Sequence, residues 1–357
     1  MPERILKLLK DPRGPRGETP GPELSRALGV TRTAVWKKIK RLRADGYQIH
    51  ASKSGYRLIS GPELSAFELA YYLPGVKIVY RESVSSTNDL ALEMAFRAMT
   101  VPGESEKSAS GEKATRPPLA DKRPLSALVV ADSQTAGRGR LGRRWLSPPA
   151  VNIYMSVVLW PELPPRKTPL LALAAGLASA LAIKGQTGLE VRLKWPNDLL
   201  ALPGKKADGR CKKLGGILLE FRSDPDRVLI AVAGIGINAN LKKSDLPKGT
   251  KNSATSILAE TGRRVNRAAL AAAVYKELDY WTGMLGKGAR AEAHLLKGYR
   301  SLCDTIGKRI RVQTEGKSFS GTATGIDDGG RLALKTPAGL LVFSTGEVHS
   351  VRDEADE

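Results

Sequence analysis

Apolar residues recur at helical spacing in three short segments near the start of the chain and then alternate in two shorter ones. The elements expected there are helices over residues 3–10, 22–28 and 31–45 and strands over residues 48–51 and 55–59. Thr31 can cap the third helix, because its hydroxyl can accept a hydrogen bond from a free backbone N–H group. Helix, glycine turn, second helix and hairpin in this order predict a winged helix-turn-helix domain over residues 1–62.

The middle of the chain alternates apolar strands with apolar-faced helices. Strands are expected over residues 76–80, 127–133, 151–160, 190–193, 213–220 and 231–240, and helices over residues 90–95, 168–184, 256–260, 267–285 and 289–301. Two polar stretches, residues 101–124 and 202–212, have the composition of inserts. The longest apolar run, residues 170–183, is short for a membrane span and predicts a buried helix.

The last part of the chain has short strands with turn residues between them. The strands are expected over residues 308–312, 317–323, 332–335 and 340–343. The Asp-Asp-Gly-Gly sequence at 327–330 is a strong turn signal. The pattern predicts a small β-barrel, and we expect no catalytic residue in it.

The chain carries a large positive charge, which points to a polyanionic partner. The formal net charge is +21, and residues 1–60 alone contain 14 Lys/Arg against 5 Asp/Glu. The candidate DNA-binding residues on the third helix and the wing are Thr31, Arg32, Thr33, Lys37, Lys40, Arg41 and Lys53. A structural or protein-binding three-helix unit is the alternative.

Few residues are able to form disulfide or metal sites. Cys211 and Cys303 are the only cysteines, and His50, His294 and His349 the only histidines. Their wide separation fits neither a disulfide framework nor a metal-ligand motif. A reducing cytoplasm is therefore the expected compartment, and no charged-then-apolar signal segment opens the chain.

Residues 137–145, which we call the strap, read Gly-Arg-Gly-Arg-Leu-Gly-Arg-Arg-Trp, with four arginines and three glycines. Glycine permits close backbone approach to a ligand, and arginine offers bidentate donors to carboxylate or phosphate groups. This composition suits a segment that orders over an anionic ligand. It suits equally a solvated basic loop or a segment that binds nucleic acid, and composition alone favours these two.

Three further motifs carry candidate chemistry. Hydroxyl and amide groups in residues 85–88 precede a helix, where they can cap it or bind a polar ligand. Residues 194–198 set a lysine, an amide and a carboxylate around Trp-Pro, which also fits a structural turn with an ordinary ion pair. Glycines at 215–216 and in the Gly-Ile-Gly of 234–236 lie inside strands, where they allow close approach of a ligand or backbone.

Taken together, these segments resemble the biotin–protein ligases, and the winged domain resembles that of the bifunctional type, which is also the biotin operon repressor. The resemblance rests on Ser86-Thr87-Asn88, Gln134, the strap and residues 194–198, 213–217 and 234–238, in this order. It implies an α+β fold in three domains. These are the winged helix-turn-helix over 1–62, a mixed-sheet, class II synthetase-like catalytic domain over 63–303, and an SH3-like β-barrel over 304–353.

The implied activity is activation of biotin by ATP to biotinyl-5′-AMP, followed by transfer of biotin to a lysine of a biotin carboxyl carrier domain, such as that of acetyl-CoA carboxylase. The implied cofactors are ATP and Mg²⁺, with biotin as substrate and no tightly bound metal. The implied partners are the carrier domain, operator DNA and a second copy of the chain in a ligand-promoted homodimer. A cytoplasmic location without membrane contact is implied as well.

The resemblance also implies roles for individual residues. The implied catalytic residues are Lys213, Arg138, Arg140 and Asp198. The implied biotin-binding residues are Ser86, Thr87, Asn88, Gln134, Arg138, Gly139, Arg140, Trp145, Lys213, Gly216 and Gly234. The implied ATP-binding residues are Arg138, Arg140, Arg143, Trp145, Lys194, Asn197, Lys213 and Asn238. No metal ligand is assigned.

The sequence departs from the family pattern in two places. Leu141 occupies a strap position where many members have a polar or basic residue. The insert before Lys213 is longer than usual, which makes Lys205 and Lys212 competitors for the catalytic lysine. We select Lys213 because Leu-Gly-Gly-Ile follows it directly.

Two other functions fit parts of the sequence. One is a non-catalytic, biotin-sensing transcription factor, against which the intact Arg138, Arg140, Asp198 and Lys213 argue. The other is a lipoate or octanoate ligase-transferase of the same fold. A transferase that works through an acyl-cysteine needs a suitably placed thiol, and neither cysteine lies within the motifs above.

Overall fold

The structure is a computed structural model, and it describes residues 2–12, 17–100, 125–202, 211–246, 254–314 and 316–350. The chain forms two compact units, Met1–Tyr80 with Asn266–Ala272, and Arg81–Val265 with Ala273–Glu357. The expected insert over residues 101–124 and most of the one over 202–212 lie outside the described residues.

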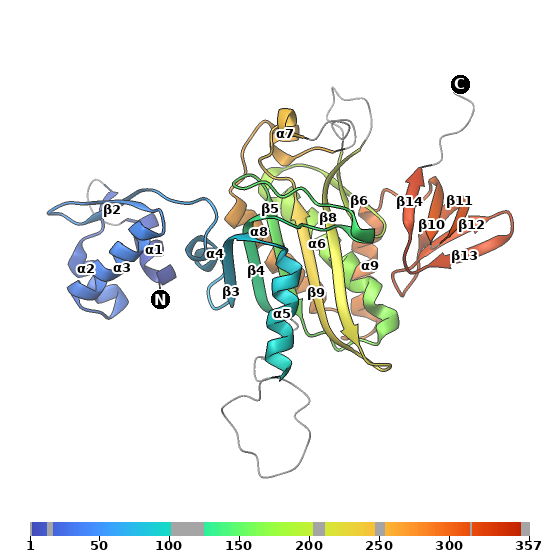
Figure 1. The fold of residues 1–357 in the computed structure, drawn as a ribbon, viewed down its shortest axis with the longest axis horizontal. Coiled ribbons are helices and arrows are strands. Elements are labelled where there is room, and N and C mark those ends of the chain that lie inside the picture. The colour runs from blue at the N-terminus through green and yellow to red at the C-terminus, as the bar shows by residue number, and fades with distance from the viewer. Residues whose placement is uncertain are drawn as a thin grey trace, which may run out of the picture. The chain divides into compact units, whose positions relative to one another are not determined.

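The N-terminal unit contains the predicted winged helix-turn-helix. Its elements are α1 (Pro2–Lys10), α2 (Gly21–Leu28), α3 (Arg32–Ala44), β1 (Gln48–Ala51) and β2 (Tyr56–Ser60) (Figure 1). The Thr31 hydroxyl caps α3 as predicted, because it accepts a hydrogen bond of 3.2 Å from the Ala34 amide. β1 and β2 pair antiparallel and form the wing.

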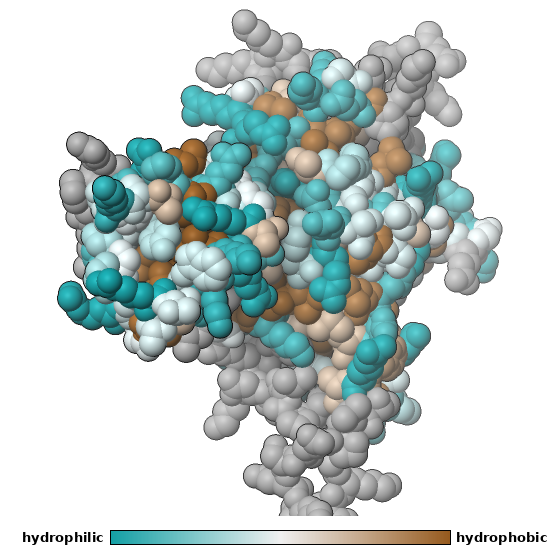
Figure 2. Space-filling model, turned by 60° about the vertical axis from the view of Figure 1, so that its left-hand side comes forward, coloured by the Kyte–Doolittle hydropathy of each residue, from teal (hydrophilic) through white to brown (hydrophobic). Residues whose placement is uncertain are grey.

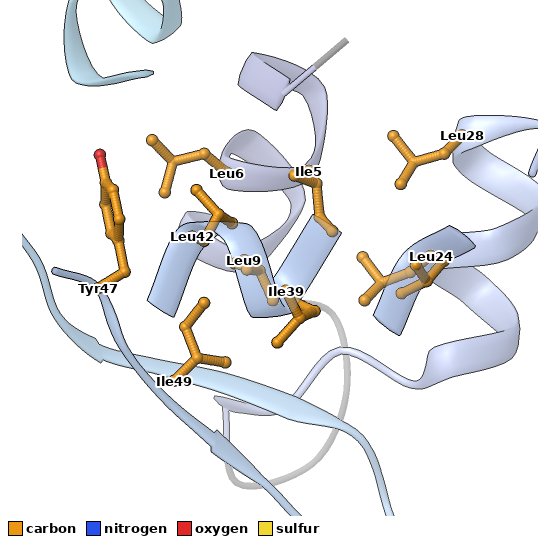
Figure 3. Close-up of a cluster of buried hydrophobic side chains, with 10 residues drawn as sticks. Ile5, Leu6, Leu9, Leu24, Leu28, Ile39, Leu42, Tyr47 and Ile49 are labelled. Atoms are coloured by element: carbon orange, nitrogen blue, oxygen red, sulfur yellow. The ribbon is translucent and has the colours of Figure 1, made fainter. Parts of the chain in front are cut away.

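Apolar side chains from the three helices and from the start of the wing converge on one core (Figure 3). Those labelled in the figure are Ile5, Leu6, Leu9, Leu24, Leu28, Ile39, Leu42, Tyr47 and Ile49. On α3, Val35, Ile39 and Leu42 are each 1% exposed, so the buried face is the one that the apolar periodicity predicts. The basic face of α3 is therefore left to solvent.

The short helix α4 (Ala66–Tyr72), which the sequence analysis missed, follows the wing. Ser65 caps it, and Glu68 in its first turn is only 4% exposed. The buried Glu68 carboxylate accepts a hydrogen bond of 3.2 Å from the Tyr47 hydroxyl and pairs with Lys10. Burial raises the pKa of Tyr47, so the phenol keeps the proton that it donates. This network ties α4 to α1 and to the wing.

A seven-stranded sheet forms the centre of the second unit, in the order β3-β4-β5-β9-β8-β7-β6 (Figure 1). The strands are β3 (Ile78–Val84), β4 (Leu125–Gln134), β5 (Ile153–Leu159), β6 (Val191–Lys194), β7 (Asp198–Ala201), β8 (Lys212–Ser223) and β9 (Val228–Ile237). Neighbours from β4 to β6 pair antiparallel. At the other edge, the amides of Thr135 and Ala136 donate to the carbonyls of Val84 and Ser85, so the chains run in the same direction there. The sheet is mixed, as predicted, although β7 was expected only as a turn.

The remaining helices of the described residues are α5 (Thr87–Thr100), α6 (Thr168–Thr187), α7 (Ile257–Thr261), α8 (Arg267–Thr282) and α9 (Ala289–Leu302). Of these, α5 packs against β4, β5 and β9, and α9 packs against β6. By length and composition α6 could cross a membrane, but 72% of its most apolar window is buried in the protein. Because α6 packs against β6, β8, β9 and α9, it is the buried core helix that the sequence predicts.

The C-terminal strands form a separate five-stranded antiparallel sheet, in the order β13-β12-β11-β10-β14. The strands are β10 (Arg309–Thr314), β11 (Lys317–Ile326), β12 (Leu332–Thr336), β13 (Gly339–Phe343) and β14 (Glu347–Ser350), of which β14 was not predicted. Trp195, which is 1% exposed, joins this domain to the central sheet. Its indole N–H donates to the Gly330 carbonyl at 3.1 Å, and its amide donates to the Thr305 hydroxyl at 3.0 Å.

Candidate functional site

A cavity of about 420 Å³ lies between the central sheet, the start of α5, the strap and residues 346–349. The predicted site residues that line it are Ser86, Thr87, Asn88, Gln134, Arg138, Gly139, Arg140, Arg143, Trp145, Lys194, Asn197, Asp198, Lys213, Gly216 and Gly234. Lining residues outside the predicted set include Arg144, Tyr154, Leu218, Gly346, Glu347, Val348 and His349. Motifs more than a hundred residues apart in the sequence therefore meet around one cavity.

One end of the cavity is a buried cluster of hydroxyl and amide groups. Thr87 and Asn88, in the first turn of α5, are 4% and 3% exposed. The Gln134 side-chain oxygen accepts hydrogen bonds from the Thr87 amide, at 2.8 Å, and from its hydroxyl, at 3.2 Å. Ser156 of β5 lies 2.8 Å from the Thr87 hydroxyl and 2.6 Å from the Asn88 side-chain oxygen. These contacts give the end a fixed set of donors and acceptors for a polar ligand.

Two glycines of β9 allow side chains to lie directly on the sheet. A Cβ atom at Gly236 would lie 2.8 Å from the Trp145 ring, and one at Gly234 would lie 2.2 Å from the Asn88 side-chain oxygen. Only glycine fits either position without moving its neighbour. Trp145 can therefore form a wall of the cavity, and its buried indole N–H has no hydrogen-bond partner.

The strap is folded into a tight turn rather than extended. The Gly139 amide donates to the Arg143 carbonyl at 2.7 Å, and the Trp145 amide donates to the Gly137 carbonyl at 2.8 Å. Between them, Leu141 has a φ of 55°, a left-handed conformation that is unusual for leucine, and its side chain is 73% exposed. The turn leaves the arginines free to face different neighbours.

The opposite end of the cavity concentrates positive charge around one carboxylate. The Lys213 ammonium lies 2.7 Å from Asp198, and the same lysine lies 5.8 Å from the Trp145 ring centroid. Burial lowers the pKa of Arg140 and the pKa of Lys194 from their ordinary values, and the charge of Asp198 opposes both shifts. Lys213 thus pairs with Asp198, whose charge also attracts Arg140 and Lys194, and an anion bound here would stabilise these cations.

The C-terminal domain contributes to the site through a segment at the start of β14. Arg140 donates to the Asn197 side chain at 3.1 Å, to the Gly346 carbonyl at 3.2 Å and to the Thr345 hydroxyl at 2.7 Å. Arg143 pairs with Glu347 at 2.6 Å. No motif in the sequence marks this segment, because its contacts to the strap span more than 200 residues.

Asn238 is the one residue of the predicted catalytic-domain set that does not line the cavity. It is 9% exposed, donates to the Thr255 carbonyl at 3.0 Å and accepts from Asn152 at 3.5 Å. Its amide is thus used to join two segments of the core, and we remove it from the ATP-binding set. The competitor Lys212 also lies outside the lining, and Lys205 lies outside the described residues.

The candidate DNA-binding residues are accessible to solvent. Thr31, Arg32, Thr33, Lys37, Lys40 and Arg41 on α3 and Lys53 on the wing are all exposed. Trp36 on the same helix was not among the predicted residues. It is 51% exposed, and its ring centroid lies 5.5 Å from the Lys40 ammonium. On the face drawn in Figure 2, hydrophilic side chains are interspersed with apolar ones.

Three family models match consecutive parts of the chain. An HTH domain matches residues 3–57, the biotin/lipoate A/B protein ligase family matches residues 121–238, and the biotin protein ligase C-terminal domain matches residues 305–349. Their order follows the order of the winged unit, the central sheet and the C-terminal sheet.

Individual proteins match over most of the chain. A bifunctional ligase/repressor BirA of Bacillus spizizenii is 36% identical over 340 residues, which cover 92% of this chain and 92% of the relative. The protein of the same name from Escherichia coli is 27% identical and covers 98% of this chain and 96% of its own length. The structure of a biotin protein ligase from Aquifex aeolicus, in complex with biotin and ATP, matches with a TM-score of 0.53 at 23% identity. It covers 78% of this chain and 99% of its own, which shows a shared fold.

The contacts of the glycines predict different effects for two similar substitutions. We expect Gly234→Ala to destabilise the folded chain by about 1–3 kcal/mol, because the new methyl group would displace the hydrogen-bonded Asn88. Gly216→Ala is the control, since its nearest neighbour would be 3.7 Å away, an ordinary contact distance. Urea unfolding of both variants measures the difference, and equal stabilities would contradict the packing described above.

Proposed function

The chain belongs to the biotin–protein ligases, and on that premise we propose that it activates biotin with ATP in this cavity and transfers biotin to a lysine of a biotin carboxyl carrier domain. In the first step, an oxygen of the biotin carboxylate attacks the α-phosphorus of ATP, which gives biotinyl-5′-AMP and pyrophosphate. In the second, a deprotonated acceptor lysine attacks the acyl carbon of the mixed anhydride. An amide forms, and AMP leaves.

The observation that supports this function best is the cluster of cations at one end of the cavity. In the first step two anions, a carboxylate and a phosphate, must come into contact. Catalysis then depends on positioning and on neutralisation of charge rather than on an acid–base pair. Lys213, Arg140 and Lys194, with one shared carboxylate, are suited to this task.

Each end of the cavity has its own part in the proposal. Lys213 bridges the carboxylate and the α-phosphate and stabilises the negative charge that develops between them. Ser86, Thr87, Asn88 and Gln134 bind the polar ureido end of biotin, and Trp145 and the β8 and β9 glycines pack against its apolar body. Arg140, Arg143, Lys194 and Asn197 contact the ATP part. Asp198 holds the Lys213 ammonium at the point of reaction.

We propose that Mg²⁺ binds together with ATP rather than at a site built from protein ligands alone. Within the described ranges, no group of three His, Cys, Asp or Glu side chains is placed to hold a metal ion. The two carboxylates of the cavity lining, Asp198 and Glu347, already pair with Lys213 and Arg143. Mg²⁺ is commonly held by substrate phosphates, waters and one or two carboxylates, and it would supply neutralisation of phosphate charge.

The winged unit gives the chain a second role, as a biotin-responsive repressor in the cytoplasm. The exposed basic face of α3 and the wing contact operator DNA. Biotinyl-5′-AMP acts as corepressor by promoting a homodimer of the chain. We place the domain boundaries at 1–62, 63–303 and 304–353, and the family matches over 3–57, 121–238 and 305–349 support them.

Both alternative functions are less well supported. A non-catalytic sensor would not need three cations around one carboxylate in its binding site. An acyl-cysteine transferase would need a reactive thiol in the cavity, but neither Cys211 nor Cys303 lines it. Burial raises the pKa of both thiols, which lowers the fraction of the nucleophilic thiolate.

In the proposed reaction, Lys213 stabilises the negative charge that develops between the two substrates. We expect Lys213→Ala to slow biotinyl-5′-AMP formation by at least about 10²-fold, the scale of losing one electrostatic stabiliser. The assay follows labelled biotin with Mg-ATP in a single turnover and then its transfer to a carrier domain. Lys212→Ala is the matched control, because that lysine lies outside the lining. A near-normal rate for Lys213→Ala would remove its role, and unlabelled carrier with the unaltered chain would remove the function.

In the proposed function, the exposed basic face of α3 and the wing bind duplex DNA. We expect the logarithm of the affinity for duplex DNA to fall linearly with the logarithm of salt concentration, because lysines and arginines displace counterions from phosphates. Lys37→Ala should reduce the slope by about one. Lys335→Ala, which removes an exposed lysine from the C-terminal sheet, should leave it unchanged. Undetectable binding at low salt would rule out the DNA-binding surface.

In the proposed function, biotinyl-5′-AMP promotes a homodimer of the chain. We expect sedimentation velocity to detect a dimer of the unaltered chain with biotin and Mg-ATP and little dimer without them. Lys213→Ala should remain mostly monomeric under both conditions, because it forms the adenylate slowly. Dimerisation that is independent of biotin and ATP would contradict the corepressor role.

A further inference from the structure

The two arginines at the centre of the strap face different partners. Arg140 contacts Asn197 and the C-terminal segment beside the cation cluster. Arg138 instead forms a bidentate ion pair with Asp89 of α5, with N–O distances of 2.7 and 2.6 Å. Glu220 of β8 lies 3.6 Å from the same guanidinium. Both terminal nitrogens of Arg138 therefore donate to Asp89, and Glu220 is a second carboxylate close by.

The two carboxylates are themselves held in place. Asp89 lies in the first turn of α5, where the helix dipole favours a negative charge. Glu220 accepts a hydrogen bond of 2.6 Å from the Asn88 amide group, which packs on Gly234 and contacts Ser156. Arg138 is thus connected, through Glu220 and Asn88, to the polar end of the cavity. The hydrogen bond to Asp89 raises the pKa of Arg138 from its ordinary value.

We propose that Asp89 and Glu220 are positioning residues that anchor the strap over the cavity through Arg138. Arg138 then acts as the attachment point of the strap, whereas Arg140 contacts the reacting anions. This inference rests on the proposed function, since what the closed strap retains is the biotinyl-5′-AMP made there. The opposite possibility is that Arg138 breaks its ion pair with Asp89 and binds the ligand instead. In that case Asp89 competes with the ligand for Arg138.

The two possibilities predict opposite effects for Asp89→Asn, which keeps the shape of the side chain and removes its charge. If Asp89 anchors the strap, release of biotinyl-5′-AMP should become about fivefold faster, as expected for loss of a partly exposed ion pair. Formation of the adenylate on the enzyme should stay within about twofold, because Asp89 does not line the cavity. If Asp89 competes with the ligand, release should become slower.

The experiment forms labelled biotinyl-5′-AMP on the enzyme from biotin and Mg-ATP, adds excess unlabelled biotin and follows release of label. Asp89→Asn, Arg138→Gln and the double variant complete a cycle, in which the double variant should release no faster than either single one. Asp89→Glu should restore retention in part. Glu93→Gln is the control, since it breaks an exposed ion pair with Arg97 on the same helix and should change nothing.

The outcomes separate this inference from the proposed function. If the unaltered chain forms no biotinyl-5′-AMP, the proposed function fails. If the unaltered chain forms and retains it, but Asp89→Asn releases it at the same rate or more slowly, the anchoring role is overturned. Additive effects of Asp89→Asn and Arg138→Gln would overturn it too, because independent residues do not form one contact. Glu220→Gln repeats the test if Asp89→Asn does not fold.

Discussion

Two side chains rest directly on the backbone of the central sheet, and the cavity depends on the glycines that leave room for them. Trp145, at the end of the strap, lies over Gly236, and Asn88, at the start of α5, lies over Gly234. A side chain at either glycine would push one of these elements off the sheet. A single strand, β9, therefore positions both the apolar wall of the cavity and its polar end, and the strap begins its turn from that support.

Trp145 holds one end of the strap on the sheet. The arginines of the strap contact several different neighbours. Arg138 pairs with Asp89, Arg140 bonds to Asn197 and the C-terminal segment, and Arg143 pairs with Glu347. The C-terminal domain is thus more than a support, since it holds two of the four strap arginines. Lys213, Arg140 and Lys194, the cations near Asp198, are best placed to bind an anion. In the proposed function the net charge of +21 therefore has two uses, at this cavity and on α3.

Local patterns predicted the elements whose residues interact with near neighbours in sequence. The buried face of α3 follows from its own periodicity, and the residues chosen from the family motifs, except Asn238, line one cavity. The strand β14 was missed because it is stabilised by pairing with the distant strand β10. The strand β7 was missed because its four residues show no alternation of buried and exposed side chains. Glu220 and Thr345 were missed because strand register and domain packing determine their contacts. The alternation of polar and apolar residues along β5 could have identified Ser156. No local pattern indicated that the Asn238 side chain forms hydrogen bonds within the core.

The exposure of the Asp89–Arg138 pair has a consequence for a two-step reaction. A mixed anhydride must be shielded from water after the first step and then exposed to an acceptor lysine in the second. A fully buried ion pair would make opening costly, because separating buried charges costs about 3–5 kcal/mol. Here the two side chains are 38% and 43% exposed, and an exposed pair is worth about 1 kcal/mol or less. Such a contact favours the closed strap between the two steps, yet it can be broken by the approach of a carrier domain.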